Sequence, residues 1–265
     1  MKTINKKFDS LTAFSAWLNA TAPAGYFADS DFLASTAASE DFTGTSSFYD
    51  ADRLLLGGWH DGAARVSAYI AGGARGHEDR PQSYYSPVGF APSVGRYLSG
   101  HPYNMINRRR VSVPAPVVSI VYNAAVHDNK NTTPAAIEKA AAKLFNVIAG
   151  LEQSGVRVEL WVGVFAKTYE REAVNIAVKI KSAGQPFNLL KMIYPIVHPS
   201  FLRRHGFAAI ERVGVPGSGW KYYGAPIITE KETEQAAAAC GLRGTCFSYY
   251  TIKNLSEKEI KEMIK

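Results

Sequence analysis

The clearest pattern of apolar and polar residues lies near the middle of the chain. Residues 117–122 and 156–165 are nearly continuous apolar runs rich in β-branched side chains, which is typical of strands buried on both faces of a parallel sheet. Residues 134–151 between them repeat apolar side chains at helical spacing. Two parallel strands joined by a helix form a right-handed βαβ unit, and we expect the rest of the fold to be built around this one.

The ends of the central helix carry their own signals. Thr133 can accept a hydrogen bond from a free backbone N–H, and Pro134 occupies the first helical position, where its missing N–H costs nothing. Gly155 follows the last turn and can adopt the left-handed conformation that ends a helix. These residues predict a helix that begins at Pro134 and ends just before Gly155.

Residues 173–181 follow a different period. Apolar and polar residues alternate strictly, which predicts a strand with one face buried and one face in solvent. The predicted solvent face carries Asn175, Lys179 and Lys181. Together these elements predict an α/β fold, an open and mostly parallel Rossmann-like sheet with flanking helices and one antiparallel strand.

Other elements are predicted from shorter signals. A helix that begins near Leu189 is expected to break at Pro195, and residues 245–252 are expected to form a final strand. Three pairs with capping-box spacing predict further helix starts: Ser47 with Asp50, Thr229 with Glu232, and Ser256 with Glu259.

The first 110 residues are less regular. Residues 8–20 have the spacing of a short amphipathic helix, and residues 21–46 are rich in Ala, Ser, Thr, Asp and Gly, which is typical of irregular cover. We therefore divide the chain into an N-terminal elaboration of short helices and loops, residues 1–110, packed on an α/β core, residues 111–265. Together they are expected to form a single compact domain.

Composition adds a basic surface. The net charge is +7 and the pI about 9.3, which favours polyanions, and nucleic acid is the commonest of these in the cytoplasm. No apolar run reaches membrane-spanning length, and no apolar segment follows the basic N-terminus as in a secretory signal. We expect a cytoplasmic protein with no membrane partner. Cys240 and Cys246 can pair or stay free, and neither their number nor their spacing indicates a metal site.

Residues 72–87 have no periodicity and much Gly and charge, which predicts a mobile loop. The loop carries Arg75 and Arg80 beside Tyr84 and Tyr85. Aromatic rings stack on unpaired bases and arginines neutralise phosphates, so these four residues form a candidate nucleic-acid contact. The alternative is a solvated loop with incidental tyrosines.

Three consecutive arginines, Arg108, Arg109 and Arg110, precede the first core strand, with Tyr103 nearby. Each would need its own partner if buried, and the run has no acidic neighbour in sequence. Salt bridges to acidic groups elsewhere and simple solvation are two alternatives. We favour anion binding.

A second group of cations and rings lies in the C-terminal half. Its residues are Arg203, Arg204, Lys221, Tyr222 and Tyr223. Single-stranded nucleic acid is bound by this combination without a specific sequence. Duplex binding more often uses a recognition helix with several basic residues on one face, which the sequence lacks.

The end of the first core strand is where open α/β sheets bind ligands. In layout this region resembles the von Willebrand factor A-like fold, whose first strand ends in an Asp-x-Ser-x-Ser motif that holds a divalent metal. The matching positions here run from Asn123 to His127, with an amide in place of the carboxylate and neither serine. We expect no metal and no cofactor there. No other enzyme signature is present, so we expect a protein without catalytic residues.

Two passages resemble a known family. Residues 86–105 read SPVGFAPSVGRYLSGHPYNM, and residues 158–161 within the βαβ unit read VELW. They are similar to a family of bacteriophage and prophage proteins of mostly unknown function, within which the chain most resembles the single-stranded-DNA-binding RNA polymerase cofactors of lytic podophages. The resemblance implies a non-enzymatic role in transcription in the host cytoplasm, in which a phage RNA polymerase is recruited to middle promoters. It assigns no binding residue.

Two other functions remain open. The first is a metal-free A-domain-like module that docks a protein partner. The second is a cryptic nuclease that uses Asp128 and His127. An oligomer is compatible with any of these functions.

Overall fold

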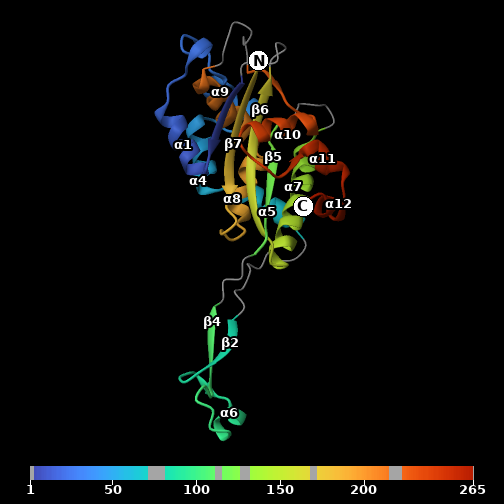
Figure 1. The fold of residues 1–265 in the computed structure, drawn as a ribbon. Coiled ribbons are helices and arrows are strands. Elements are labelled where there is room, and N and C mark those ends of the chain that lie inside the picture. The colour runs from blue at the N-terminus through green and yellow to red at the C-terminus, as the bar shows by residue number, and fades with distance from the viewer. Residues whose placement is uncertain are drawn as a thin grey trace.

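The chain folds into a main α/β body and a small separate sheet (Figure 1). The structure, a computed structural model, describes residues 3–70, 81–110, 115–125, 132–167, 172–214 and 223–264. The expected α/β class, with a mostly parallel sheet flanked by helices, is confirmed. Within the described ranges, no helix is both long enough and apolar enough to cross a membrane.

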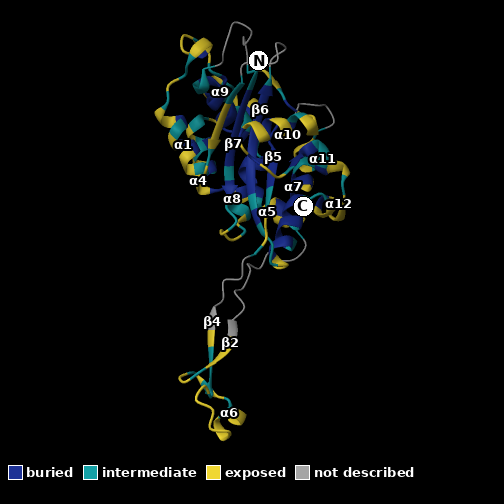
Figure 2. Ribbon diagram, viewed as in Figure 1, coloured by how far each residue is buried: buried dark blue, intermediate teal, exposed yellow. Residues whose placement is uncertain are grey.

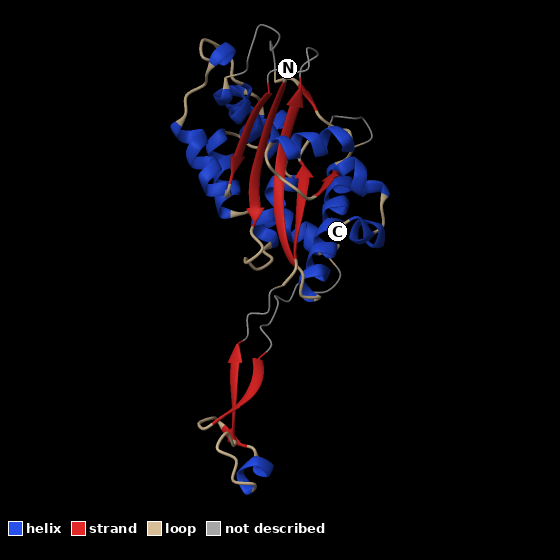
Figure 3. Ribbon diagram, in the orientation of Figure 1, coloured by secondary structure: helices blue, strands red, loops and turns tan. Residues whose placement is uncertain are grey.

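The main sheet has six strands and a central order β1-β7-β6-β5-β9 (Figure 3). β5 runs parallel to β6 and β9, and β1 runs parallel to β7. β6 and β7 are antiparallel, and β8 pairs antiparallel with the end of β6. β7, β1 and β8 therefore all run opposite to β6, whereas the sequence predicts only one antiparallel strand. The strands are β1 (Thr3–Phe8), β5 (Val117–Asn123), β6 (Arg157–Lys167), β7 (Ala173–Lys181), β8 (Ala225–Pro226) and β9 (Thr245–Ser248).

The predicted βαβ unit is present as β5, α7 (Pro134–Gln153) and β6. The Oγ1 atom of Thr133 accepts a hydrogen bond from the N–H of Ala136 at 3.2 Å, with Pro134 in the first turn. Gly155 has a φ of 89°, the left-handed conformation that L side chains rarely adopt. Leu144 and Ile148 of α7 are fully buried against the sheet. Local signals and burial agree here, so the prediction is confirmed.

Helices cover both faces of the main sheet. A large buried cluster joins the sheet to α1, α7 and α8, and a smaller one joins the other face to α10. The remaining helical elements are α1 (Leu11–Ala20), η1 (Gly25–Phe27), α2 (Ala34–Ala37), α3 (Glu40–Thr43), α4 (Phe48–Gly57), α5 (His60–Ser67), α8 (Leu189–Val197), η2 (Phe201–Gly206), α9 (Phe207–Val213), α10 (Glu230–Ala239), α11 (Tyr249–Asn254) and α12 (Glu257–Met263).

The first strand, β1, is missing from the sequence prediction. Its residues Asn5, Lys6 and Lys7 are exposed, so the segment lacks the apolar run of a central strand. It forms because β7 offers a free edge, against which Thr3–Phe8 pairs in parallel register with Ala173 to Val178. The main sheet therefore includes residues on both sides of the boundary drawn at residue 110.

The predicted solvent face of β7 is wrong. Asn175 and Lys181 are each only 2% exposed. Asn175 donates to the side chain of Asn5 at 2.9 Å, and the Nζ of Lys181 donates to the carbonyl of Val158 at 3.0 Å and forms an ion pair with Glu152. Polar side chains on both faces of β7 are covered because they have partners inside the fold, which a period of two does not reveal.

Several shorter predictions need correction. α8 continues through Pro195, with Pro195, Ile196 and Val197 buried, because burial of this turn offsets the hydrogen bond that proline removes. The final strand ends at Ser248, whose side chain caps α11 by accepting from the N–H of Thr251.

In two of the three predicted capping boxes, the first residue caps its helix as expected. Ser47 caps α4 by accepting from the N–H of Asp50, and Ser256 and Glu259 form the full reciprocal box at α12. Thr229 makes no such bond at the start of α10; its hydroxyl donates to Glu232 instead.

The small sheet, residues 81–110, is here called the arm, and Figure 1 shows it pointing away from the main body. It contains β2 (Pro81–Ser86), β3 (Ala91–Pro92), α6 (Val94–Leu98) at the tip and β4 (Met105–Arg110). β4 pairs antiparallel with both β2 and β3. The expected loop over residues 72–87 is therefore wrong for residues 81–86, which form a strand, while residues 72–80 lie outside the described residues. The residues of β4 that pair with β2 lie 19 to 29 positions further along the chain, from Ser86 with Met105 to Pro81 with Arg110, so no local pattern marks the strand.

Candidate nucleic-acid interface

The arm combines basic charge with an absence of carboxylates. Residues 81–110 contain four arginines, at positions 96, 108, 109 and 110, and no Asp or Glu. None of the described side chains between residues 83 and 108 is buried, as Figure 2 shows by the lack of dark blue on the arm. The side chains of residues 83–108 therefore form no hydrophobic core, and residues 81–110 contain no negatively charged side chain to neutralise their arginines.

Large apolar side chains cover the arm and remain in contact with solvent. Tyr97 is 64% exposed and Leu98 78% exposed at the tip. The others in this set are Tyr84, Tyr85, Val88, Phe90, Val94 and Tyr103. A concentration of large exposed apolar side chains is typical of an interaction site in a folded protein.

Two arginines lie over rings of the arm. The guanidinium of Arg96 is 3.9 Å from the centroid of the Tyr85 ring, and that of Arg108 is 4.8 Å from the centroid of Phe90. Arg96 also donates to the carbonyl of Tyr103 at 3.5 Å. These contacts connect α6, β2 and β4, and they hold cations beside ring faces. A surface of this composition can stack on bases and neutralise phosphates.

The structure places part of the predicted interface on the arm. Tyr84, Tyr85, Tyr103 and Arg108 are exposed there. The backbones of Arg109 and Arg110 pair in β4 opposite Gln82 and Pro81. Four other predicted residues, Arg75, Arg80, Lys221 and Tyr222, lie outside the described residues.

Three residues of the arm interface are absent from the sequence prediction: Phe90, Arg96 and Tyr97. They lie in a stretch dense in Gly and Pro, where no period assigns a face to any side chain. The lack of any acidic residue from 81 to 110 is the sequence signal that marks this stretch as an interface.

Arg204 has a structural role, and its assignment to nucleic-acid binding is wrong. Its side chain is fully buried. The guanidinium donates to four carbonyl oxygens, those of Ser35, Thr36, Ala38 and Thr45, at 2.8 to 3.1 Å. Burial lowers the pKa of this side chain, which stays cationic at neutral pH. It fixes the backbone around α2 and has no free donor for phosphate at the surface.

Tyr223 is also a structural residue, which corrects its assignment to base stacking. Its hydroxyl accepts from the N–H of Ala34 at 2.7 Å and donates to the buried carboxylate of Glu211 at 2.6 Å. Its ring is stacked between Phe207 and Phe27. Burial, followed by the neighbouring Glu211 carboxylate, raises the pKa of Tyr223. Both ring faces are occupied, so no base can stack there.

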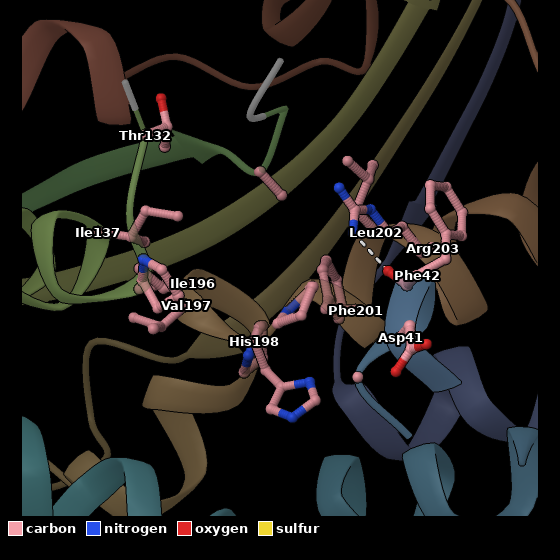
Figure 4. Close-up of a pocket in the computed structure, with 15 residues that line it drawn as sticks. Asp41, Phe42, Thr132, Ile137, Ile196, Val197, His198, Phe201, Leu202 and Arg203 are labelled. Atoms are coloured by element: carbon pink, nitrogen blue, oxygen red, sulfur yellow. Dashed lines mark hydrogen bonds between the residues drawn. The ribbon is translucent and has the colours of Figure 1, made fainter. Parts of the chain in front are cut away.

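Arg203 is half-buried on the main body, away from the arm. Its guanidinium lies 4.3 Å from the centroid of the Phe42 ring and donates to the Phe42 carbonyl. Together with His198 it lines a cavity of about 300 Å³ beyond the end of β5 (Figure 4). Thr132 and Ile137 line the opposite side of this cavity.

The cavity carries little polar chemistry among its described residues. The Nδ1 of His198 accepts from the N–H of Ser200 at 3.2 Å. Burial, followed by the charges of Arg65 and His205, lowers the pKa of His198 to about 4, so the ring is neutral at pH 7. Most of the other lining residues are apolar, including Ile196, Phe201 and Leu202.

Asn123, which the sequence predicts in place of a metal-binding aspartate, is a buried structural residue. Its Nδ2 donates to the carbonyl of Ile227 at 2.7 Å and to Thr233 Oγ1 at 3.1 Å, and its Oδ1 accepts from the N–H of Ala125. The amide joins β5 to the segment before α10, where a carboxylate would lack both donor bonds. His127 and Asp128 lie outside the described residues, and the described part of the chain holds no cluster of three metal-binding side chains.

The cysteines do not pair with each other. Cys240 and Cys246 are both free and buried. Burial is the main cause that raises the pKa of each thiol to about 11, so both are protonated at neutral pH. They contribute apolar volume to the cluster beneath α10.

Residues 2–265 match a family described as "Domain of unknown function (DUF7192)". The chain belongs to this family. The match includes the main body and the arm, so the arm lies within the DUF7192 unit. No curated protein and no solved structure matches the chain.

Proposed function

We propose that this protein binds single-stranded DNA through the arm and has no catalytic role. The observation that carries the proposal is the arm surface, which presents exposed rings and arginines with no carboxylate among residues 81–110. Every polynucleotide has phosphates that attract the arginines. Only unpaired bases have both faces free to stack on rings such as Tyr97 and Tyr103.

The role in transcription rests on the resemblance to the polymerase cofactors of lytic podophages. A protein that holds single-stranded DNA at a promoter presents an open template to a polymerase. We propose that the chain acts in this way in the cytoplasm of a phage-infected host, as a cofactor that recruits a phage RNA polymerase to middle promoters. The polymerase contact is not assigned to any residue.

The test is a titration of a labelled single-stranded oligonucleotide and of the matching duplex at two salt concentrations. We expect tighter binding of the single strand and a steep loss of affinity at the higher salt, because each neutralised phosphate contributes about −0.7 to the slope of log K against log salt concentration. Equal affinity for both forms contradicts the proposal. Addition of Mg²⁺ or Mn²⁺ should release no cleaved product, and cleavage would instead support a nuclease.

A matched control tests whether the loss of any exposed ring and cation lowers DNA affinity, or only the loss of those on the arm. Tyr49 on the main body is 77% exposed and Arg53 is exposed on the same helix, α4. Their replacement by Ala removes a ring and a cation without touching the arm. We expect this pair of substitutions to leave oligonucleotide affinity unchanged, whereas Tyr97→Ala with Arg108→Ala lowers it.

A protein-docking role for the arm is the second candidate, and one observation favours it. Val88, Val94 and Leu98 are each at least 67% exposed. Aliphatic side chains neither stack well on bases nor contact phosphates, so DNA alone leaves them unexplained. Their natural partner is an apolar protein surface.

A further inference from the structure

A second surface of the molecule has the opposite charge to the arm. Residues 21–50, here called the acidic segment, contain five carboxylates and no Lys, Arg or His. Four of them are exposed and form no ion pair with any described residue: Asp29, Asp31, Glu40 and Asp41. The fifth, Asp50, lies 3.8 Å from Arg53. The protein is basic overall, so this concentration of negative charge is local.

The acidic segment also exposes large apolar side chains. Tyr26 is 54% exposed, Phe32 58% and Phe42 44%. Tyr26 and Phe42 lie at the two ends of a continuous row of rings, in which each ring centroid is 4.2 to 6.4 Å from the next: Tyr26, Phe27, Tyr223, Phe207 and Phe42. Phe207 belongs to α9, so the row of rings connects the acidic segment to that helix.

Basic side chains at this surface are few among the described residues. Arg203 lies over the ring of Phe42, and Arg53 lies beside Asp50. Arg53 lies 3.8 Å from Asp50, within the acidic segment, and the guanidinium of Arg203 donates to the carbonyl of Phe42. The surface is therefore negative and aromatic, whereas the arm is positive and apolar.

We propose that the arm of one copy of this protein docks on the acidic segment of a second copy. Both surfaces expose apolar side chains that burial would stabilise. Residues 81–110 contain arginines and no carboxylate, whereas residues 21–50 contain carboxylates and no Lys, Arg or His, which gives electrostatic complementarity across the contact. The aliphatic side chains Val88, Val94 and Leu98, which DNA leaves unexplained, are covered in this contact.

The contact is between copies because the two surfaces lie far apart in one chain. Figure 1 shows the arm, with α6 at its tip, pointing away from the main body, while the segment between α1 and α4 lies on the opposite part of that body. A contact between two different surfaces is heterologous, so each copy retains one free arm and one free acidic segment. Association therefore continues into a ring or an open chain of molecules.

The experiment measures the mass of the full-length protein by sedimentation velocity after nuclease treatment, over a range of protein concentrations. We expect association that grows with concentration and weakens at high salt, since exposed charges are screened beyond a Debye length of about 8 Å at physiological ionic strength. A single-chain mass at every concentration in low salt overturns the proposal. This measurement contains no DNA, so its outcome is independent of the proposed function.

Charge-reversal variants test whether association depends on the arm and on the acidic segment. Arg96→Glu with Arg108→Glu, and separately Asp31→Lys with Asp41→Lys, should each abolish association. An equal mixture of the two variants should restore it, because each altered surface then meets a partner of opposite charge. Loss without recovery in the mixture overturns the assignment, and unchanged melting temperatures establish that both variants are folded.

The matched control is Glu234→Lys with Glu262→Lys. Both glutamates are exposed, on α10 and α12, and their reversal changes the net charge by the same amount as the acidic-segment variant. We expect its association to equal that of the natural protein. An equal loss in the control means that net charge, and not the acidic segment, drives association, which overturns the proposal.

Discussion

The guanidinium of Arg96 lies 3.9 Å from the centroid of the Tyr85 ring, and this contact connects the tip helix of the arm to β2. An exposed cation–π contact contributes about 0.5–1 kcal/mol. In a unit whose described side chains include no buried residue, contacts of this size and the strand hydrogen bonds hold the shape. The same two side chains form part of the surface that we assign to DNA.

Replacement of Tyr97 and Tyr103 by Ala should weaken binding of single-stranded DNA by about 1–3 kcal/mol for each base that stacks on them. The slope of log K against log salt concentration should stay nearly unchanged, because no phosphate contact is removed. Fluorescence titration at several salt concentrations measures both quantities. Normal affinity in this variant rules out stacking on these two rings.

Replacement of Arg108, Arg109 and Arg110 by Ala should weaken the same binding by about tenfold or more and reduce the salt slope by about 0.7 for each lost phosphate contact. The tyrosine and arginine variants therefore differ in their salt dependence. If the arginine variant is folded and keeps both its affinity and its slope, the phosphates are bound elsewhere, and Arg203 becomes the next residue to replace.

Arg204→Ala should lower the free energy of unfolding by about 3–5 kcal/mol, because it removes charge-assisted hydrogen bonds to four backbone carbonyls and leaves a cavity. Urea denaturation measures the change. Arg203→Ala is the matched control, since Arg203 is the neighbouring arginine and is only half-buried, and it should cost about 1 kcal/mol or less. Equal costs for the two variants contradict the structural role of Arg204.

The stability of the main body should fall as pH falls from about 6.5 to about 4. His198 is neutral in the folded state because burial lowers its pKa to about 4, with Arg65 and His205 opposing its charge. In the unfolded chain His198 protonates below its ordinary pKa of about 6.5. The stability that comes from keeping this ring neutral is therefore fully present above pH 6.5 and is lost as the pH falls towards 4. The difference between the two pKa values corresponds to about 3 kcal/mol in the free energy of unfolding.

His198→Asn should flatten this part of the curve of unfolding free energy against pH, since Asn cannot titrate and its Oδ1 can accept from Ser200 in place of Nδ1. Some dependence should remain from His205, whose pKa burial also lowers. Asp52 contributes mainly below about pH 4, because its pKa is lowered. If the variant and the natural protein show the same dependence of unfolding free energy on pH, groups other than His198 cause that dependence.

Asn123→Asp should destabilise the fold by about 1–3 kcal/mol, because the new carboxylate has no donor for the Ile227 carbonyl or the Thr233 hydroxyl. Millimolar Mg²⁺ should not raise the melting temperature of the natural protein or of the variant. The Asn123 side chain forms hydrogen bonds within the fold, and we expect no metal ion to bind at this position. A Mg²⁺-dependent increase in either melting temperature contradicts this prediction.

The sequence predicts the βαβ unit well because local signals and burial agree there. Thr133, Pro134 and Gly155 mark the ends of α7, and apolar runs mark β5 and β6. β1 and β2 escape prediction because each depends on a partner distant in sequence, β7 and β4 respectively. The solvent face predicted for β7 fails because its polar residues have buried partners.

The residues of the candidate site are also predicted only in part, again because distant contacts decide which side chains are exposed. Proximity of cations and rings in sequence correctly marks exposed residues on the arm, including Tyr85 and Arg108. The same signal at Arg204 and Tyr223 marks side chains that stabilise the fold. Cation and ring content alone cannot distinguish an exposed arginine from one whose terminal guanidinium nitrogens donate to backbone carbonyls inside the fold. The carbonyls that bind Arg204 lie in residues 35–45, far away in sequence.

The pairing of β1 with β7 has a consequence for synthesis on the ribosome. Thr3–Phe8 leaves the exit tunnel early, but its partner strand begins at Ala173. Until that partner emerges, the N-terminal strand has no edge to join, and contacts between such distant segments form slowly. The arm emerges in this interval and needs no part of the main sheet to pair its own strands. During synthesis, the arm can therefore become able to bind its partners before the body that carries it is complete.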